Sequence, residues 1–485
     1  MPLSHFESII MNRQSTADSD KHAGHRYLTV WRWHFYAGLF VAPFLTLLAV
    51  TGLGMLLFAN LTGKEGERIS VTPQAHIQPL SAQAEAARQA VNPDTASVVQ
   101  YIAPRAEDMV AVFRVDNGGD SVMAAVDPYT AKVVSTMPRS QGWYHTFDHI
   151  HSSILLGKTG DYLIETAVSL TILMIITGFY LWWTKPGSGS RKGRLKAVFL
   201  PKTGSGRSLW RSLHGAFGSW IMLVLLLFCL SGMAWAGIWG GKIVQSWSQF
   251  PAGKWGVEPA PESVVPTHGD VLNDGQTKEV PWILELTPMP VSGTTLGDNG
   301  INPQEPMTLE TLDRFAREIG FEGRYQLNLP KGEKGVWTLS QDSMSYDKIS
   351  PFADRTVHID QYSGKILADI RFSDYNAFGK FMAASIALHM GTLGWWSVLA
   401  NAVFCLLVVF ICISGCVMWW KRRPSKAHGL YPPARHSQTR PWYAMAVPLI
   451  LLACIFPTAI AAIIAVWLLD MLLISRIPQL KHWFK

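Results

Sequence analysis

The hydrophobic pattern divides the chain into five long apolar runs and two long polar stretches. The apolar runs cover residues 34–60, 161–184, 212–236, 380–420 and 442–474. Because a bilayer core needs about 20 apolar residues in helical form, each run predicts a membrane-spanning helix. The first run is too long for a secretory signal, and no small-residue cleavage site follows it. We interpret it as an uncleaved anchor.

Each polar stretch predicts a small α+β domain. Residues 80–91 and 308–320 have helical periodicity, and short alternating runs typical of strands follow each of them. Each stretch then reaches a strand–turn–strand pattern, at residues 125–133 (AVDPYTAKV) and 358–366 (HIDQYSGKI). The order of span, α+β domain and span therefore occurs twice, which predicts an internal duplication followed by a fifth span.

Four histidines occupy matching places in this repeat. His34 and His214 open the first and third spans, and each precedes a hydroxyl residue and Gly by seventeen positions. His151 and His389 stand near the start of the second and fourth spans, which both end in the pattern [Thr/Ser]-Gly-x-x-x-Trp-Trp. A polar residue in a span is costly, so these positions are functional candidates. The other histidines, such as His268 and His358, are expected at the surface.

Composition and charge agree with a membrane protein. The 485 residues are 48% hydrophobic and 16% charged, with 20 Trp and a net charge of +7. Eight basic residues and no acid lie in residues 185–211, and six basic residues and no acid lie in 421–440. The polar stretches carry more acids than bases. By the positive-inside rule the basic loops are cytoplasmic, and we expect no nucleic-acid partner.

These observations predict a helical membrane bundle of about five spans with two small periplasmic α+β domains. The N-terminus is placed in the cytoplasm. The expected segments are a cytoplasmic N-terminus (1–33), the first span (34–60), the first external domain (61–150), the second span with an external extension (151–184), a basic loop (185–211), the third span (212–236), the second external domain (237–379), the fourth span with an extension (380–420), a basic loop (421–441), the fifth span (442–474) and a tail (475–485).

The repeated patterns resemble a known family. The D-x-Y-[ST]-x-K hairpins are similar to the PepSY domain. The histidine-bearing spans that end in Trp-Trp resemble the PepSY-associated transmembrane helix family of iron-regulated bacterial inner-membrane proteins, over roughly residues 27–425. This family includes ferric-siderophore reductases that hold b-type haems between membrane histidines. The first hairpin has Ala131 where the second has the usual Gly364, which leaves only its turn type open.

Imidazole is the usual axial ligand of haem iron, so paired histidines predict haem b, held without covalent attachment. His34 and His214 would hold an inner haem, and His151 and His389 an outer one. His149 remains an alternative for the outer pair, and so does His145, which lies four residues before it. The segment from His151 to the end of its span has 32 residues, which would be about 48 Å long as one continuous helix. The outer haem is therefore expected at or beyond the external membrane surface unless the helix breaks.

We expect no flavin or NAD(P) site in this chain. The glycine cluster at residues 187–193 lacks the dinucleotide spacing, and no strand precedes it. Electrons would come from a separate donor, either a flavin reductase or a membrane quinol. The resemblance implies a haem-containing inner-membrane oxidoreductase that reduces a periplasmic ferric siderophore in iron uptake. The alternative is a non-redox membrane protein, either a PepSY-type binding or regulatory module or a permease for an iron complex.

Overall fold

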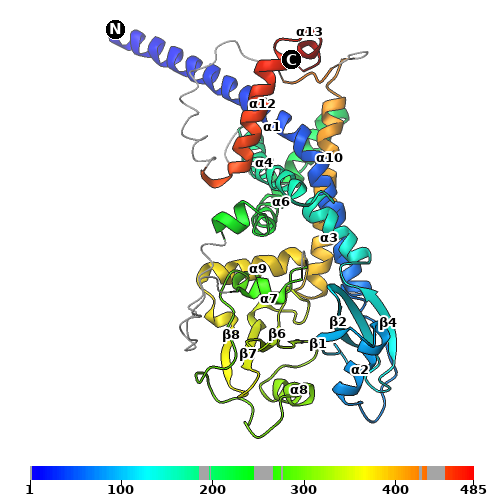
Figure 1. Cartoon of the computed structure of the whole chain (residues 1–485). Helices are drawn as coiled ribbons and strands as arrows, with labels where there is room; N and C mark the ends of the chain where they lie inside the picture. Colours follow the sequence, from blue (N-terminus) through cyan, green and yellow to red (C-terminus); the bar gives the residue numbers. More distant parts are fainter. Residues whose placement is uncertain are drawn as a thin grey trace. The chain divides into compact units, whose positions relative to one another are not determined.

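The chain forms two compact units (Figure 1). The membrane unit comprises residues 1–50, 152–239 and 403–485, and the sheet unit comprises residues 51–151 and 240–402. The computed structural model describes residues 3–184, 196, 198–244, 266–274, 277–424, 429–433 and 454–484. The glycine cluster named above lies outside the described residues.

Long apolar helices make up the membrane unit. Their bounds are α1 (Leu3–Leu61), α4 (Gly157–Trp183), α6 (Gly206–Met233), α10 (Trp395–Trp420) and α12 (Pro457–Leu469), which continues as η8 (Asp470–Ile474). Within the described ranges, five helical segments are long and apolar enough to cross a membrane, as the sequence predicted. The chain is therefore a membrane protein with several apolar helices. The short helix α13 (Pro478–Phe484) completes this part, and the chain enters the sheet unit within η1 (Trp239–Val244).

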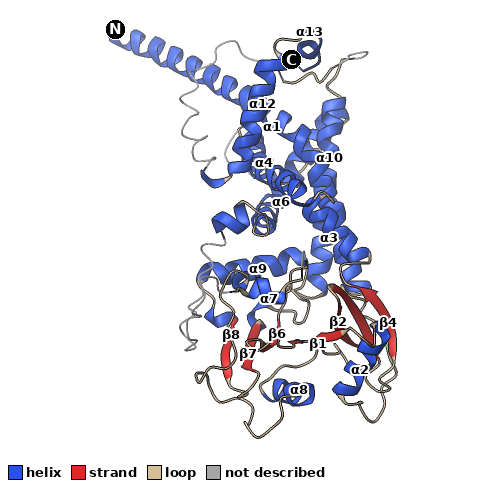
Figure 2. Cartoon of the chain, viewed as in Figure 1, coloured by secondary structure: helices blue, strands red, loops and turns tan. Residues whose placement is uncertain are grey.

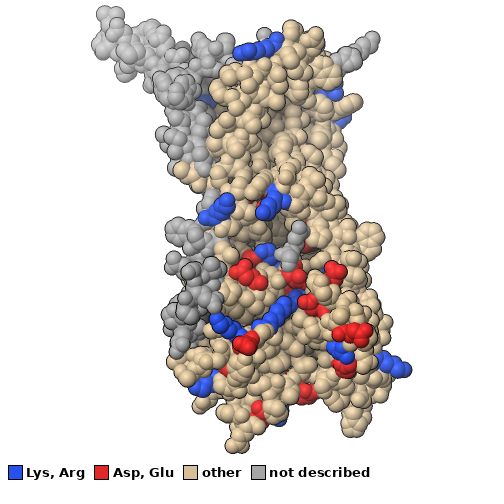
Figure 3. Space-filling model, viewed as in Figure 1, with Lys and Arg blue, Asp and Glu red and all other residues tan. Residues whose placement is uncertain are grey.

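The membrane helices pack through small residues and aromatic rings. Ala49, Ile221 and Val408 form a buried apolar cluster between three helices. Rings of Phe228 and Phe404 lie with their centroids 4.5 Å apart. Many large apolar side chains remain exposed on these helices, and on the face in Figure 3 charged side chains gather mainly on the sheet unit. This distribution fits helices that have lipid as their solvent.

Two helices that the sequence predicted as continuous are broken. Helix α3 (Trp143–Ser153) ends before α4 begins, and Ile154 and Leu155 between them have φ of 45° and 60°. Helix α9 (Ala377–Met390) ends at Gly391, whose φ is 71°, before α10 begins. Left-handed residues end a right-handed helix. The segment over 151–184 therefore breaks just before Gly157, an alternative that the sequence left open, and the 48 Å length does not apply.

The polar stretches form one antiparallel sheet of eight strands in the order β4-β3-β2-β1-β5-β6-β7-β8 (Figure 2). The strands are β1 (Ser97–Ile102), β2 (Ala111–Asn117), β3 (Asp120–Val126), β4 (Val133–Pro138), β5 (Gln326–Asn328), β6 (Val336–Gln341), β7 (Arg355–Asp360) and β8 (Ile366–Arg371). Pairing of β1 with β5 joins the two halves. The sequence predicted two separate small domains; the structure instead merges them, because each half offers an open edge strand.

The two halves share the same local plan. Helix α2 (Leu80–Val91) precedes β1, and α8 (Leu309–Glu318) precedes β5. Both predicted hairpins are present, between β3 and β4 and between β7 and β8. Ala131 has φ of 52° where Gly364 has φ of 68°. The alanine therefore adopts the same left-handed conformation as the glycine, at the steric cost that a Cβ brings there.

One face of the sheet is apolar; the second face carries a small apolar cluster around β2 and β3 and buried polar residues elsewhere. Residues such as Phe113, Leu327 and Ile359 are buried against α2 and α8 on the apolar face. The alternate residues point to the other face, and they include Gln100, Arg114, Gln326, Asn328, Thr338 and His358, all buried. The segment with α7 (His268–Leu272) and η4 (Trp282–Leu284) covers this polar face. Two further short turns are η5 (Pro351–Ala353) and η6 (Phe372–Asp374).

Candidate functional site

The candidate inner histidines each contact a hydroxyl residue on a neighbouring helix of the membrane unit. Nδ1 of His34 on α1 lies 2.9 Å from Oγ1 of Thr177 on α4. Nδ1 of His214 on α6 lies 2.8 Å from Oγ of Ser414 on α10. The two contacts are equivalent in the repeat, because both hydroxyl residues belong to the [Thr/Ser]-Gly-x-x-x-Trp-Trp ends of their spans. Both rings are half-buried.

Each hydroxyl group contacts both the histidine ring and a carbonyl oxygen of its own helix. Oγ1 of Thr177 lies 2.9 Å from the carbonyl oxygen of Leu173, and Oγ of Ser414 lies 2.9 Å from that of Ile411. In the tautomer with the proton on Nδ1, each ring donates to the hydroxyl oxygen, and the hydroxyl hydrogen goes to the carbonyl. Nε2 of that neutral tautomer keeps its lone pair, which a metal can take.

The glycine after each hydroxyl residue allows the histidine ring to lie against the helix. A Cβ at Gly178 would stand 3.0 Å from Cε1 of His34, which is closer than ordinary contact. A Cβ at Gly415 would stand 3.8 Å from Cε1 of His214. The two imidazoles are also close enough to interact electrostatically. The structure thus places His34 and His214 in the same unit, each beside a glycine of a neighbouring helix.

The candidate outer histidines lie together in the sheet unit. The ring centroids of His151 on α3 and His389 on α9 are 6.5 Å apart, and the ring planes make an angle of 81°. Nδ1 of His151 lies 2.9 Å from Oγ1 of Thr51. A Cβ at Gly52 would stand 3.4 Å from Cε1 of His151. Thr51-Gly52 is thus a third hydroxyl–glycine pair that holds a histidine ring through Nδ1.

The two alternative outer residues occupy different surroundings. His145 is 4% exposed and packs edge-on against the ring of Tyr144. Burial, with the nearby cation Lys64, lowers the pKa of His145 to about 4, so this ring is neutral at physiological pH. His149 is half-buried on the same helix. His151 on this helix is in ring contact with His389.

The break between α9 and α10 positions His389. The side chain of Asn401 donates from Nδ2 to the carbonyl oxygens of Leu388, at 2.7 Å, and of His389, at 3.1 Å. Both carbonyls lie in the last turn of α9, where they have no partner within the helix. Thr392 adds a bond to a third carbonyl of this turn, that of Ala387, at 3.2 Å. The helix end that carries His389 is therefore fixed by side chains that follow the break.

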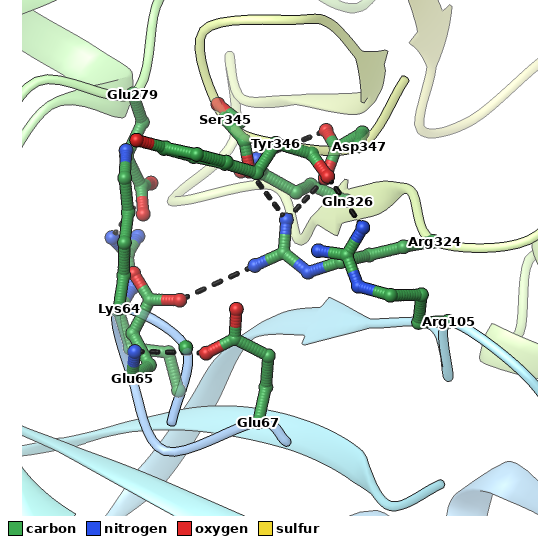
Figure 4. A network of polar contacts seen from close by, with 12 residues as sticks. Lys64, Glu65, Glu67, Arg105, Glu279, Arg324, Gln326, Ser345, Tyr346 and Asp347 are labelled. Atoms are coloured by element: carbon green, nitrogen blue, oxygen red, sulfur yellow. Dashed lines mark hydrogen bonds and ion pairs between the residues drawn. The ribbon is translucent and has the colours of Figure 1, made fainter. Parts of the chain in front are cut away.

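A buried ionic network lies in the same unit (Figure 4). The Arg324 guanidinium sits between the carboxylates of Glu65, at 3.2 Å, and Asp347. Arg105 donates to the main-chain oxygen of Tyr346 at 2.7 Å, and the Tyr346 hydroxyl donates to that of Met390 at 3.2 Å. Tyr346 therefore links the network to Met390, the residue that follows His389.

The acids of this network are held away from water. Burial raises the pKa of Asp347 to about 7, although the Arg324 guanidinium opposes the shift. Burial and the neighbouring Glu67 raise the pKa of Glu65 as well. Lys64 lies over the rings of Tyr144 and Tyr346, at 5.5 and 5.0 Å from their centroids. These groups could be missed in sequence analysis, because isolated acids in a polar stretch carry no spacing signal.

Two histidines expected at the surface are buried instead. His268 and His358 are 2% and 0% exposed, and their Nε2 atoms lie 3.0 Å apart. Nδ1 of His268 lies 2.9 Å from the main-chain oxygen of Thr287, and Nδ1 of His358 lies 3.0 Å from the hydroxyl of Thr338. A chain of hydrogen bonds satisfies both rings. The expectation of surface positions was wrong. His358 on β7 points to the polar face of the sheet, and the segment with α7 and η4 covers that face.

Comparison with known proteins identifies the family. Within the part of the chain that the structure describes, His, Cys, Asp and Glu form no cluster of three or more that could hold a metal ion. A comparison with curated proteins found no match. The family model described as the PepSY-associated TM region matches residues 31–422. Because this match covers most of the chain, including both histidine pairs, the protein belongs to the PepSY-associated transmembrane family.

Proposed function

We propose that this chain is a haem b-containing membrane reductase that passes electrons across the membrane to an external ferric siderophore or similar Fe(III) chelate. His34 and His214 would hold one haem, and His151 and His389 a second. The observation that carries the proposal is the repeated contact between a histidine Nδ1 and the hydroxyl of a [Thr/Ser]-Gly pair. Metal-bound histidines characteristically use their second nitrogen in this way, which orients the ring and sets the tautomer.

The outer pair fits a metal held between two imidazoles. His151 and His389 would each supply one imidazole nitrogen, and their ring centroids lie 6.5 Å apart. The donor set also fits, because neutral imidazole is a usual axial ligand of haem iron.

When bound, haem supplies one-electron redox chemistry. The residues of this chain would orient the two axial rings, exclude water with apolar helices and keep Nδ1 protonated on a hydroxyl oxygen. Glycines 52, 178 and 415 would leave the rings room against their helices. At the external acceptor, one electron converts Fe(III) to Fe(II), and hard oxygen ligands hold Fe(II) less tightly. The metal then leaves the chelator.

The charge pattern supports the proposed orientation. Basic loops of eight and six cationic residues alternate with acidic stretches, and cytoplasmic loops carry the excess of Lys and Arg. We therefore place the protein in a bacterial inner membrane with its N-terminus in the cytoplasm and the sheet unit in the periplasm. The common plan of helix and four strands in each half of the sheet supports an internal duplication. A separate flavin reductase or quinol would donate the electrons.

The first experiment is optical and uses the full-length protein purified from haem-replete cells. We expect a Soret band, a reducible α-band and about two haems per chain, with both axial positions filled by histidine. Replacing His34 or His214 by Ala should remove about one haem, and replacing His151 or His389 should remove the other. His149→Ala is the matched control, because it changes a histidine on the same helix as His151.

Two results would contradict the proposal. Colourless protein from haem-replete cells would leave the histidines as helix-packing or proton-relay groups in a non-redox binding protein or permease. Retention of both haems in all four variants would disprove the assigned pairs. The acceptor is tested separately, by adding a ferric hydroxamate to the reduced protein without oxygen and trapping Fe(II) with a coloured chelator. Haem oxidation without Fe(II) release would exclude iron reduction but retain the haem assignment.

A further inference from the structure

Two arginines of the membrane unit lie near each other, on the side of His34 and His214 that adjoins the basic loops. Arg207 lies in the first turn of α6, seven residues before His214. Positions seven apart share a helix face and stand about 10 Å apart along the axis. Arg422 stands just after the end of α10, close enough to Arg207 for the two charges to interact.

Tyr27 occupies on α1 the place that Arg207 has on α6, because it stands seven residues before His34. It is close enough to Arg207 to interact with its charge. The faces of α1 and α6 that carry the two histidines therefore also meet two helical turns nearer to the basic loops. The arginine cluster is thus in line with the histidine pair along the two helices.

Aromatic rings hold the Arg422 guanidinium in place. Its Cζ atom lies 5.3 Å from the ring centroid of Trp31 and 5.0 Å from that of Phe35, both on α1. One of its nitrogens donates to the main-chain oxygen of Tyr431. Arg422 and Arg207 are both half-buried. A charge that only sets the topology needs no such placement, because the positive-inside rule counts loop charges whatever they contact.

The segments that form the cluster contain no acid to balance these charges. Residues 21–64, 185–211 and 421–440 have neither Asp nor Glu. Among the described residues, Nε of Arg207 is buried and has no hydrogen-bond partner. A buried charged donor without a partner costs free energy, and a second cation nearby adds repulsion. Both costs indicate a negatively charged ligand with acceptor oxygens at this place.

We propose that Arg207 and Arg422 bind the propionate carboxylates of the haem assigned to His34 and His214, a site that rests on the proposed function. Haem carries its propionates on one edge, so a haem between the two histidines can turn that edge toward the arginines. Arg suits a carboxylate because its donors form a rigid fork, and charge-assisted bonds of this kind are strong. The arginines would fix the rotation of the haem about the axial bonds, which the histidines alone leave open.

The first test measures how firmly the purified full-length holoprotein keeps its haem. Arg207→Gln and Arg422→Gln should each speed the transfer of one haem of two to apomyoglobin at least about tenfold, since a charge-assisted bond is lost. The midpoint potential of the same haem should fall, because loss of a nearby cation favours the ferric state. Arg423→Gln is the matched control, because it removes a neighbouring arginine that lies over Trp419 and Trp420 instead.

The second test shows whether the propionates are the groups that the arginines bind. Full-length His151→Ala protein from haem-depleted cells, which keeps only the inner site, is titrated with haem and with haem dimethyl ester, whose carboxylates are uncharged. We expect haem to bind at least about tenfold more tightly than the ester, and Arg207→Gln to lose most of that preference. The comparison of haem with ester needs no arginine variant, so it stays valid if Arg207→Gln fails to fold.

The outcomes separate this inference from the proposed function. Colourless wild-type protein would contradict the haem assignment and the arginine site with it. Two haems with unchanged retention in both Gln variants, or equal binding of haem and ester, would overturn the arginine site alone. Variants that weaken haem and ester equally would show that the arginines act through another anion, such as a lipid phosphate, which also overturns the proposal.

Discussion

Replacing Thr177 by Val tests the contact on which the inner site depends. Valine has nearly the same shape as threonine, so packing is kept and the hydroxyl alone is lost. Oγ1 of Thr177 lies 2.9 Å from Nδ1 of His34, and in the tautomer proposed for a metal ligand it accepts from Nδ1 while its hydrogen goes to the Leu173 carbonyl. After the change, the Nδ1–H of His34 has lost its acceptor. The Leu173 carbonyl keeps its ordinary helical bond.

The size of the effect follows from the lost hydrogen bond. A buried donor left without its partner costs about 1 to 3 kcal/mol, and each 1.4 kcal/mol is about tenfold in an equilibrium constant. We therefore expect haem at the inner site to bind about 5- to 150-fold more weakly. This range includes the 10- to 100-fold loss that is common when the hydrogen-bond partner of a metal ligand is removed.

The assay is the transfer of haem from the purified protein to excess apomyoglobin, followed in the Soret region. Thr171→Val is the matched control, because Thr171 is buried on the same helix and its hydroxyl donates to the carbonyl of Ala167 at 2.8 Å. We expect faster loss of one haem of two in Thr177→Val and wild-type behaviour in the control. Identical transfer from the two variants would refute the role assigned to the Thr177 hydroxyl.

Three further outcomes are expected. Burial lowers the pKa of His268 to about 4 and that of His358 well below 6.5. As the pH falls from about 6.5 to 4, the unfolded chain therefore binds more protons than the folded chain, and the protein becomes less stable. A variant with Gln at both positions should lose this part of the pH dependence of thermal unfolding. Replacing Arg324 by Leu leaves two buried carboxylates without their cation and should lower the free energy of unfolding by about 3 to 5 kcal/mol, measured as a lower midpoint of thermal unfolding. An unchanged midpoint would show that Arg324 does not hold the network together. Replacing Asn401 by Ala removes the side chain that caps the end of α9. This change should shift the redox potential or the spectrum of the haem proposed on His389 more than that of the other haem. Equal shifts in both haems would indicate a general loss of structure.

Much of the architecture could be predicted from the order of apolar and polar residues. The five spans follow from run length, because the bilayer sets the number of apolar residues that a helix needs. The hairpins around residues 127–132 and 360–365 follow from turn chemistry, and both are present. The histidine candidates follow from their repeated positions. The exact positions of the helix breaks before Gly157 and after Met390 are harder to predict from the sequence, because apolar residues such as Ile154 and Leu155 adopt left-handed conformations only under tertiary constraint.

The sequence by itself determined the membrane helices, the α+β stretches, the family resemblance and the four candidate histidines, because these depend on local composition, periodicity and repetition. Tertiary structure decided which groups meet. It paired each of His34, His214 and His151 with a hydroxyl–glycine pair, and it joined two expected domains through β1 and β5. It also buried His358. Such contacts join residues 90 to 230 positions apart, and periodicity along one segment contains no information about the partner that will cover it.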